Sequence, residues 1–384
     1  MQSIIIIKKV IFTLFFLILS LPSLLLAQEV HQEFQETIKA EVIEVTNQYE
    51  RDIMGTGAST TVQELKIKLK DGERTGEMVD LENDLMVLSV GDDIFVNRLV
   101  AVDGIEYFTF KDVERRGPML AIVILFFALI IWLSGRQGLR AITSLAISIL
   151  AIIFLLVPAL LKGYSPALAS LAISGLILSV TLFFTHGFKP RVFITFLGTF
   201  SAVFVTCAIA WIWVKWMKLT GFGDDASVYL NFATGGTLDL SGLLLGSIII
   251  GLLGLLDDVS ITQASVVQEL KSANAVFGFK ELYNRAIKVG RDHVGSLVNT
   301  LALAYVGAAL PMILLFAYGA SPIFLVINQE VVAAEVLRIV VGSIGLILAV
   351  PLTTAMAAWY FKDKIVKEDG VHICSHPVDE EAKH

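Results

Sequence analysis

Two adjacent aspartates, Asp257 and Asp258, end a long apolar run that reads GLLGLLDDVSITQ. A charged aspartate costs about 2.5–3.5 kcal/mol at the centre of a bilayer on insertion scales, and less near the interface. The pair is therefore either the hydrated end of a helix or a functional group. In the second case it binds a proton or cation, or concentrates cations at the inner mouth of a path. Adjacent helical side chains point about 100° apart, so the two carboxylates are not a ready-made dyad.

Glycines accompany these aspartates along the same helix. They fall on two sides of it, with Gly242, Gly246 and Asp257 on one and Gly251, Gly254 and Asp258 on the other. Because glycine lets helix backbones approach closely, we expect neighbouring helices to enclose this one. The carboxylates are then expected to project inward near the cytoplasmic boundary of the membrane.

A second polar set lies in the run VGRDHVGSLVNTLALAY. At helical spacing its small polar residues form one face, made by Ser296 and Thr300 with Asn299 on the flank. Arg291 and Asp292 come one to two turns earlier and are a candidate ion pair. Arg291 is also either a partner for one of the two aspartates or a basic anchor at the inner interface.

A third set, Gly342 and Gly345 ahead of Pro351, predicts close helix packing in the last apolar run. A polar seam that only packs helices explains these faces nearly as well as a substrate path does.

The elements that must hold these residues are membrane-spanning helices. With 55% hydrophobic and 17% charged residues, the composition is typical of a polytopic membrane protein. Seven apolar stretches are each long enough to cross a bilayer: 118–134, 141–162, 166–185, 192–213, 239–257, 296–318 and 335–360. We therefore predict a polytopic α-helical membrane protein of about seven transmembrane helices. Its membrane domain covers 113–361 and includes a cytoplasmic amphipathic segment at 258–295.

Residues 28–112 have a different pattern. Five short runs rich in Val, Ile, Phe and Tyr are separated by turn residues such as those of KDGER and GDD. This predicts a small all-β domain, an OB-like barrel. Such barrels bind many different ligands, so the domain is either a structural cap outside the membrane or a binding module.

The N-terminal segment predicts the orientation. Lys8 and Lys9 precede an apolar stretch that ends at Ala27, which is typical of a signal peptide over 1–27, or else of an uncleaved first helix. Either way the β domain lies outside. Lys and Arg are then concentrated in the cytoplasmic connections, in agreement with the positive-inside rule, whereas the outer connections hold only Lys162, Lys215 and Lys218, with Arg338 near an outer helix start. Arg115 and Arg116, just outside the first span, count against the rule but do not reverse it. The C-terminus, a disordered tail over 362–384, is expected in the cytoplasm.

Enzymatic activity has little support. GFGDD at 221–225 resembles the Gly-x-Gly-Asp signature of membrane aspartyl proteases, but the chain has no Tyr-Asp pair to complete it. Hydrolase, zinc-protease, nucleotide-loop and dinucleotide motifs are absent from the sequence, so we expect no enzyme and no cofactor. No basic stripe interleaved with aromatics suggests nucleic-acid binding.

The tail carries four residues of metal-binding type: His372, Cys374, His376 and His384. They could hold a metal only weakly, because a flexible tail seldom preorganises its ligands. We expect no metal site. Cys207 and Cys374 do not suggest a disulfide framework.

Four ordered motifs resemble those of the YibE/F-like family of bacterial multi-pass membrane proteins: GLLGLLDDVSITQAS, VGRDHVGSLVNTLALAY, INQEVVAAEVLRIVVGSIGL and VPLTT. The resemblance runs over nearly the whole mature chain. It implies a prokaryotic cytoplasmic-membrane protein with a small extracytoplasmic domain ahead of the spans, and it implies no mechanism.

The family's pattern has one aspartate after the glycine-rich helix, and Asp258 matches it. Asp257 stands where an apolar residue is usual, so the resemblance favours Asp258. The residues of this chain that match the second motif are Gly290, Arg291, Asp292, Asn299 and Thr300.

Two functions follow from these patterns. The first is a secondary transporter or channel-like permease for an ion or small solute, whose path includes Asp258, Asp257, Ser296, Asn299 and Thr300. The second is a non-transporting scaffold or sensor whose outer β domain binds a ligand or a partner protein. The expected partners are the lipid bilayer and either a second copy of the chain or another membrane protein.

Overall fold

The computed structural model describes residues 35–53, 57, 59–72, 74–100, 106–319 and 322–364. The predicted signal segment and the metal-type residues of the tail lie outside these ranges. Near Leu125 the chain divides into two compact units, one mainly of strands and one of helices.

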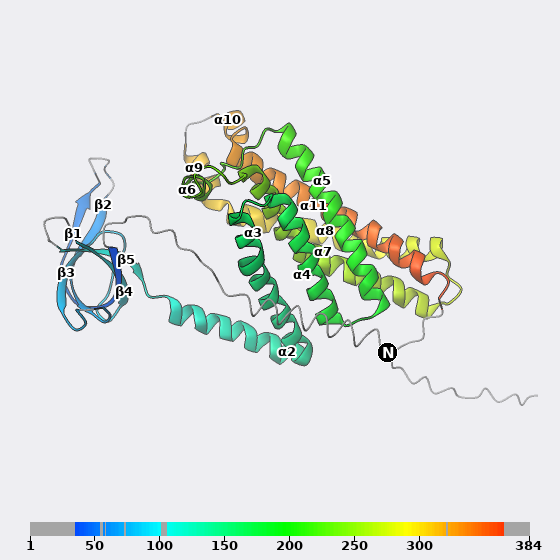
Figure 1. Cartoon of the computed structure of the whole chain (residues 1–384), viewed down its shortest axis with the longest axis horizontal. Helices are drawn as coiled ribbons and strands as arrows, with labels where there is room; N and C mark the ends of the chain where they lie inside the picture. Colours follow the sequence, from blue (N-terminus) through cyan, green and yellow to red (C-terminus); the bar gives the residue numbers. More distant parts are fainter. Residues whose placement is uncertain are drawn as a thin grey trace, which may run out of the picture. The chain divides into compact units, whose positions relative to one another are not determined.

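The first unit is an antiparallel half-barrel of five strands (Figure 1): β1 (Gln35–Asp52), β2 (Ser59–Leu69), β3 (Met78–Asn83), β4 (Asp93–Val100) and β5 (Glu106–Val113). The strand order is β3-β2-β1-β4-β5. The long β1 pairs with both β2 and β4, and register shifts between Val42 and Asn47 bend it along its length. Alternate apolar residues of the strands fill one core. The small all-β domain is confirmed, whereas its side of the membrane stays a prediction.

A kinked helical run follows the strands and crosses the division into the second unit. Helix α2 (Arg116–Ala151) continues through one π-helical turn, Ile152–Leu156, into α3 (Val157–Leu161). At Gly135 the backbone leaves helical geometry, with φ 52° and ψ −126°, so two helical segments meet there. Glycine adopts this positive φ at little steric cost. The kink lies between the first two predicted spans.

The other helices are α4 (Pro166–His186), α5 (Pro190–Trp216), α6 (Asp225–Ala233), α7 (Leu240–Ala273), α8 (Phe279–Ala308), α9 (Leu310–Tyr318), α10 (Ile323–Ile327) and α11 (Glu330–Phe361). Prolines open α4 and α5, where the missing N–H has no helical partner to lose. Aspartate side chains cap the next two helices. Asp224 accepts the Ser227 N–H of α6, and Asp239 accepts the Gly242 N–H of α7.

Among the described residues, five helical runs are long and apolar enough to cross a membrane, and the bent pair α8 and α9 would make a sixth. The predicted count of about seven is therefore not confirmed. The difference arises because Arg116–Leu161 is one helical run through the Gly135 kink, and because α8 and α9 meet at 60°. The predicted amphipathic segment 258–295 is divided between the end of α7, a turn and the first half of α8.

Helix α7 lies at the centre of the helical unit, packed against α4, α5, α8 and α11 (Figure 1). Its residues Ile248, Leu252 and Leu256 are almost fully buried, at 0%, 1% and 1% exposure. A helix that contacts four neighbours is covered by protein over most of its surface, although Gly251, Gly254 and Asp258 stay exposed. Helix α7 therefore positions the candidate residues that follow.

Candidate functional site

The two adjacent aspartates of α7 lie in opposite environments. Asp257 is 8% exposed, and its Oδ1 atom has no hydrogen-bond partner among the residues the structure describes. Asp258 is exposed on the surface of the helical unit and interacts electrostatically with His186 at the end of α4. The single step of about 100° between neighbours on a helix produces this difference.

Helices α7 and α8 run antiparallel, and two contacts set their register. A Cβ on Gly251 would lie 2.8 Å from the Tyr305 hydroxyl oxygen. Further along α7, the Gln263 amide donates a hydrogen bond of 2.8 Å to the Ala286 carbonyl. Since Asp258 lies between Gly251 and Gln263, it is at about the depth of Ser296 on α8.

The polar residues predicted on α8 are exposed on the helical unit: Arg291, Asp292, Ser296, Asn299 and Thr300. Thr300 donates to the Ser296 carbonyl at 3.0 Å, so its hydroxyl is used within the helix. Among the described residues, Arg291 and Asp292 form no ion pair with each other or with the α7 aspartates.

A cavity of about 390 Å³, cavity B, opens where these exposed faces meet. Thr262 and Gln263 line it from α7, Asp292 and His293 from α8, and Val350 from α11. Exposed polar residues of α7 and α8 thus lie on one side of the helical unit. Asp258 lies on α7 one turn before Thr262.

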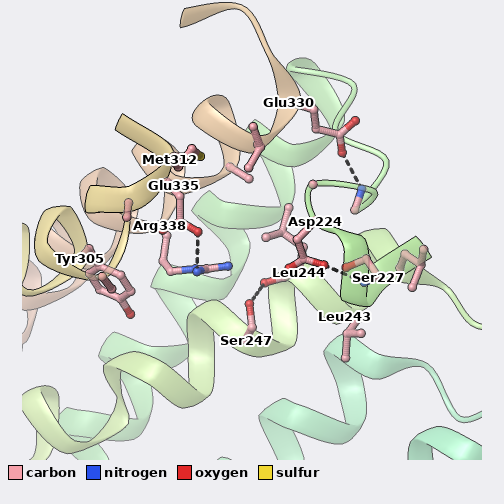
Figure 2. A pocket seen from close by; sticks show the side chains of 17 residues that line it. Asp224, Ser227, Leu243, Leu244, Ser247, Tyr305, Met312, Glu330, Glu335 and Arg338 are labelled. Atoms are coloured by element: carbon pink, nitrogen blue, oxygen red, sulfur yellow. Dashed lines mark hydrogen bonds and ion pairs between the residues drawn. The ribbon is translucent and has the colours of Figure 1, made fainter. Parts of the chain in front are cut away.

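A second cavity, cavity A, lies at the opposite end of the same three helices and has a volume of about 410 Å³. Leu240, Leu243, Leu244 and Ser247 of α7, Tyr305 and Ala308 of α8, and Ala334, Glu335 and Arg338 of α11 line most of it. The rest of its lining comes from Glu330 and Val331 at the start of α11, from Ala309 and Met312, and from the segment 221–227 (Figure 2).

A charged pair lies inside cavity A. The Arg338 guanidinium donates to Glu335 at 2.7 Å, one turn away on α11, and its carbon atom lies 5.8 Å from the centre of the Tyr305 ring. Figure 2 shows the guanidinium reaching across the cavity toward the side of Ser247 and Asp224. Ionisable residues in membrane-length helices are costly, so this pair is a candidate functional site.

The wall of cavity A nearest the start of α11 is a loop tied to that helix. The carboxylate of Glu330 accepts the N–H groups of Thr220 and Gly221, each at 2.7 Å, and the Thr220 hydroxyl. Gly221 has a φ of 87°, and a Cβ there would collide with the backbone of Leu240. The loop is therefore held between the first turns of α7 and α11, and it carries the GFGDD sequence into the cavity wall.

An apolar layer lies along α7, α8 and α11 between the two cavities. Leu252 of α7 and Leu301 of α8 are 1% and 4% exposed. A Cβ on Gly342 of α11 would lie 2.6 Å from Leu252 and 3.2 Å from Leu301. These three residues separate the polar linings on either side.

The predicted packing glycines have different surroundings. Gly242 and Gly246 face α4, where an added Cβ would meet Pro166 and Ser170, and Gly345 faces Thr206 of α5. Gly254, in contrast, has no heavy atom within 4 Å of such a Cβ. Close approach through glycine therefore joins α7 to α4 and α11 to α5.

Sequence reasoning did not find cavity A. It counted Arg338 only as a basic residue near a helix start, and it set aside GFGDD as an incomplete protease signature. The available signal was the charge pair Glu335 and Arg338 in VVAAEVLRIVV, at helical spacing inside an apolar run.

Comparison with known protein families gives a match. A family model described as YibE/F-like protein matches residues 122–363, which is more than half of the chain and covers most of the helical unit. None of the curated proteins and none of the solved structures matches the chain.

Proposed function

The chain belongs to the YibE/F-like family, and from that premise we propose that it is a secondary transporter or channel-like permease for an ion or small solute. It acts in the cytoplasmic membrane of a bacterium, with seven spans, the β unit outside and the C-terminus inside. The chain works without a cofactor and is not an enzyme.

One observation carries this proposal: cavities A and B lie at opposite ends of the same three helices, α7, α8 and α11. In the proposed orientation cavity A opens toward the outside and cavity B toward the cytoplasm. A path between the two cavities forms if the apolar layer of Leu252, Leu301 and Gly342 moves apart. Transporters bind their substrates between helices near the bilayer midplane, and small movements there expose the site to each side in turn.

The polar residues around cavity B then have a role. Asp258, Ser296 and Thr300 form the inner mouth, where the carboxylate concentrates cations. The exposed polar face of α8 also supports a second copy of the chain or another membrane protein as a partner, because uncovered polar groups are costly in lipid.

The test is a flux assay on the full chain reconstituted in vesicles, with dyes that report pH and monovalent cations. We expect Asp258→Asn to abolish a flux seen in the wild type while reconstitution efficiency is unchanged. Glu269→Gln is the matched control, because Glu269 is also an exposed acid of α7 but lies three turns beyond Asp258, away from the polar residues of α8. Normal flux in Asp258→Asn would contradict the role given to the inner mouth.

A second candidate function rests on the β unit. Gln63 holds Leu88 by two hydrogen bonds, of 2.7 and 3.1 Å to its N–H and carbonyl. The neighbouring residues Leu85, Val87 and Val90 are left 72%, 59% and 63% exposed. An exposed apolar segment of this kind marks an interaction surface, which supports a sensor or scaffold. Deleting residues 28–112 would abolish such a function and would leave flux unchanged.

A further inference from the structure

Exposed aromatic side chains gather at one end of the helical unit, the end that holds cavity A. They come from three separate helices, with exposed fractions of 71% for Trp216 of α5, 75% for Tyr229 and 76% for Phe232 of α6, and 94% for Tyr318 of α9. Figure 1 shows α6, α9 and α10 together at this end. Residues of α6 and α9 also belong to the lining of cavity A.

Helix α6 (Asp225–Ala233) is held only at its start. Its N-cap, Asp224, accepts the Ser227 N–H at 2.6 Å, and both residues line cavity A. Tyr229 and Phe232 are three residues apart, so they share one face of the helix. In the described part of the chain, no other helix packs closely along α6. An aromatic face that the chain leaves uncovered in this way marks an interaction surface.

The cover that fits this face is lipid. Helix α5 is long and apolar enough to cross a membrane, and its exposed Ile212 lies one turn before Trp216. The aromatic end is therefore continuous with a membrane-facing side of α5. Tryptophan and tyrosine are enriched where spanning helices leave the hydrocarbon. Lys215 and Lys218 are exposed beside Trp216, and lysines at such positions extend their charge to the phosphates of lipid headgroups.

We propose that the lipid headgroup layer surrounds this end of the helical unit and that α6 lies in the layer as an interfacial helix. Tyr229 and Phe232 enter the lipid, while the first turn of α6 keeps Asp224 and Ser227 in the wall of cavity A. Cavity A then opens at the depth of the headgroups, where a solute reaches it from water without crossing hydrocarbon. This placement requires only that the helical unit crosses a membrane, and it does not depend on the proposed transport.

The test measures the depth of α6 in the full chain, reconstituted in lipid nanodiscs that leave both membrane surfaces open to the solvent. In a chain with Cys207 and Cys374 replaced by alanine, Phe232→Cys carries a bimane fluorophore. Because Phe232 is exposed, its replacement leaves the core intact. We expect phosphatidylcholine brominated near the glycerol backbone to quench the label about twofold or more, because an interfacial helix buries its apolar face about 5–10 Å into the lipid. Lipid brominated at the end of the acyl chain should quench it less. Tyr318→Cys should give the same order.

Glu281→Cys is the control, because Glu281 is also exposed but lies in the first turn of α8, at the opposite end of the helical unit. Its label should be quenched by iodide in the water and by neither lipid. Quenching of the Phe232→Cys label by iodide alone would place α6 in water. Stronger quenching by the deep bromines would place it in the hydrocarbon, and a label that no quencher reaches would mean that a second copy or another protein covers the face. Each of these three results, or equal lipid quenching of Phe232→Cys and Glu281→Cys, would overturn the proposal.

Discussion

At the scale of single residues, position on a helix decides what a charged side chain can do. Asp257 and Asp258 are neighbours in sequence, yet one is buried against protein and the other faces outward. The Glu335 and Arg338 pair has the opposite geometry. Three residues apart on α11, the two side chains lie on one face and bond to each other inside a cavity.

A glycine of α5 gives a prediction at this scale. A Cβ on Gly198 would lie 2.5 Å from the Thr353 hydroxyl oxygen and 3.0 Å from its Cα, in the backbone of α11. We expect Gly198→Ala to destabilise the chain by about 1–3 kcal/mol, because the facing helix must move.

The matched control is Gly254→Ala, which has open space around the added Cβ. Since alanine favours the helix, that change should be neutral or stabilising by up to about 1 kcal/mol. Both are measured as unfolding midpoints in the same detergent. Equal losses in the two variants would mean that α5 and α11 do not meet as described.

At the scale of elements, the helical unit contains continuous helices and interrupted ones. Helix α7 runs unbroken from Leu240 to Ala273 and lines both cavities, whereas the helical run through Gly135 is kinked and α9 turns away from α8 by 60°. Pro311 lies in the first turn of α9, where it cannot donate a hydrogen bond back to α8. The continuous α7 therefore lines both cavities without a break, whereas the wall of cavity A includes the junction between α8 and α9.

The loop beside cavity A gives the prediction for this scale. Glu330→Ala removes the carboxylate that accepts the N–H groups of Thr220 and Gly221. We expect these amides to exchange hydrogen at least about tenfold faster, because hydrogen bonds to a charged group are among the stronger ones. The measurement is hydrogen exchange with mass spectrometry over the peptide 218–224. Gln329→Ala, next to it and exposed, should leave the rate unchanged. Unaltered exchange in Glu330→Ala would show that other contacts hold the loop.

At the scale of the whole molecule, the chain joins a β half-barrel to a helical unit that has a cavity at each end of α7, α8 and α11. Within the described residues, polar groups gather at those two ends and an apolar layer separates them. Cavity A faces the outside and cavity B faces the cytoplasm only if the helical unit has the predicted orientation in the membrane.

Cysteine labelling tests that orientation and the number of spans. In a chain with Cys207 and Cys374 replaced by alanine, a membrane-impermeant thiol reagent should label Ser59→Cys in intact cells. It should label Gln137→Cys and Lys364→Cys only after the membrane is opened. Label at Ser59→Cys only in opened cells would reverse the topology. No label at Gln137→Cys in either case would mean that Arg116–Leu161 crosses the membrane once.

The amino-acid sequence by itself determined the class of the protein, its β unit, the apolar helices and the family. The first three depend on hydropathy and on periods of two or about 3.6 residues, and the family depends on four short motifs; all of these are local properties of the chain. The tertiary structure decided which polar residues meet. Tyr305, Arg338 and Asp224 are far apart in sequence. The packing of α8 against α11 brings Tyr305 and Arg338 together, and the loop that Glu330 of α11 holds adds Asp224 to the same cavity. It also decided that Asp257 is buried and Asp258 exposed, because which face of α7 is covered depends on where α4, α5, α8 and α11 lie.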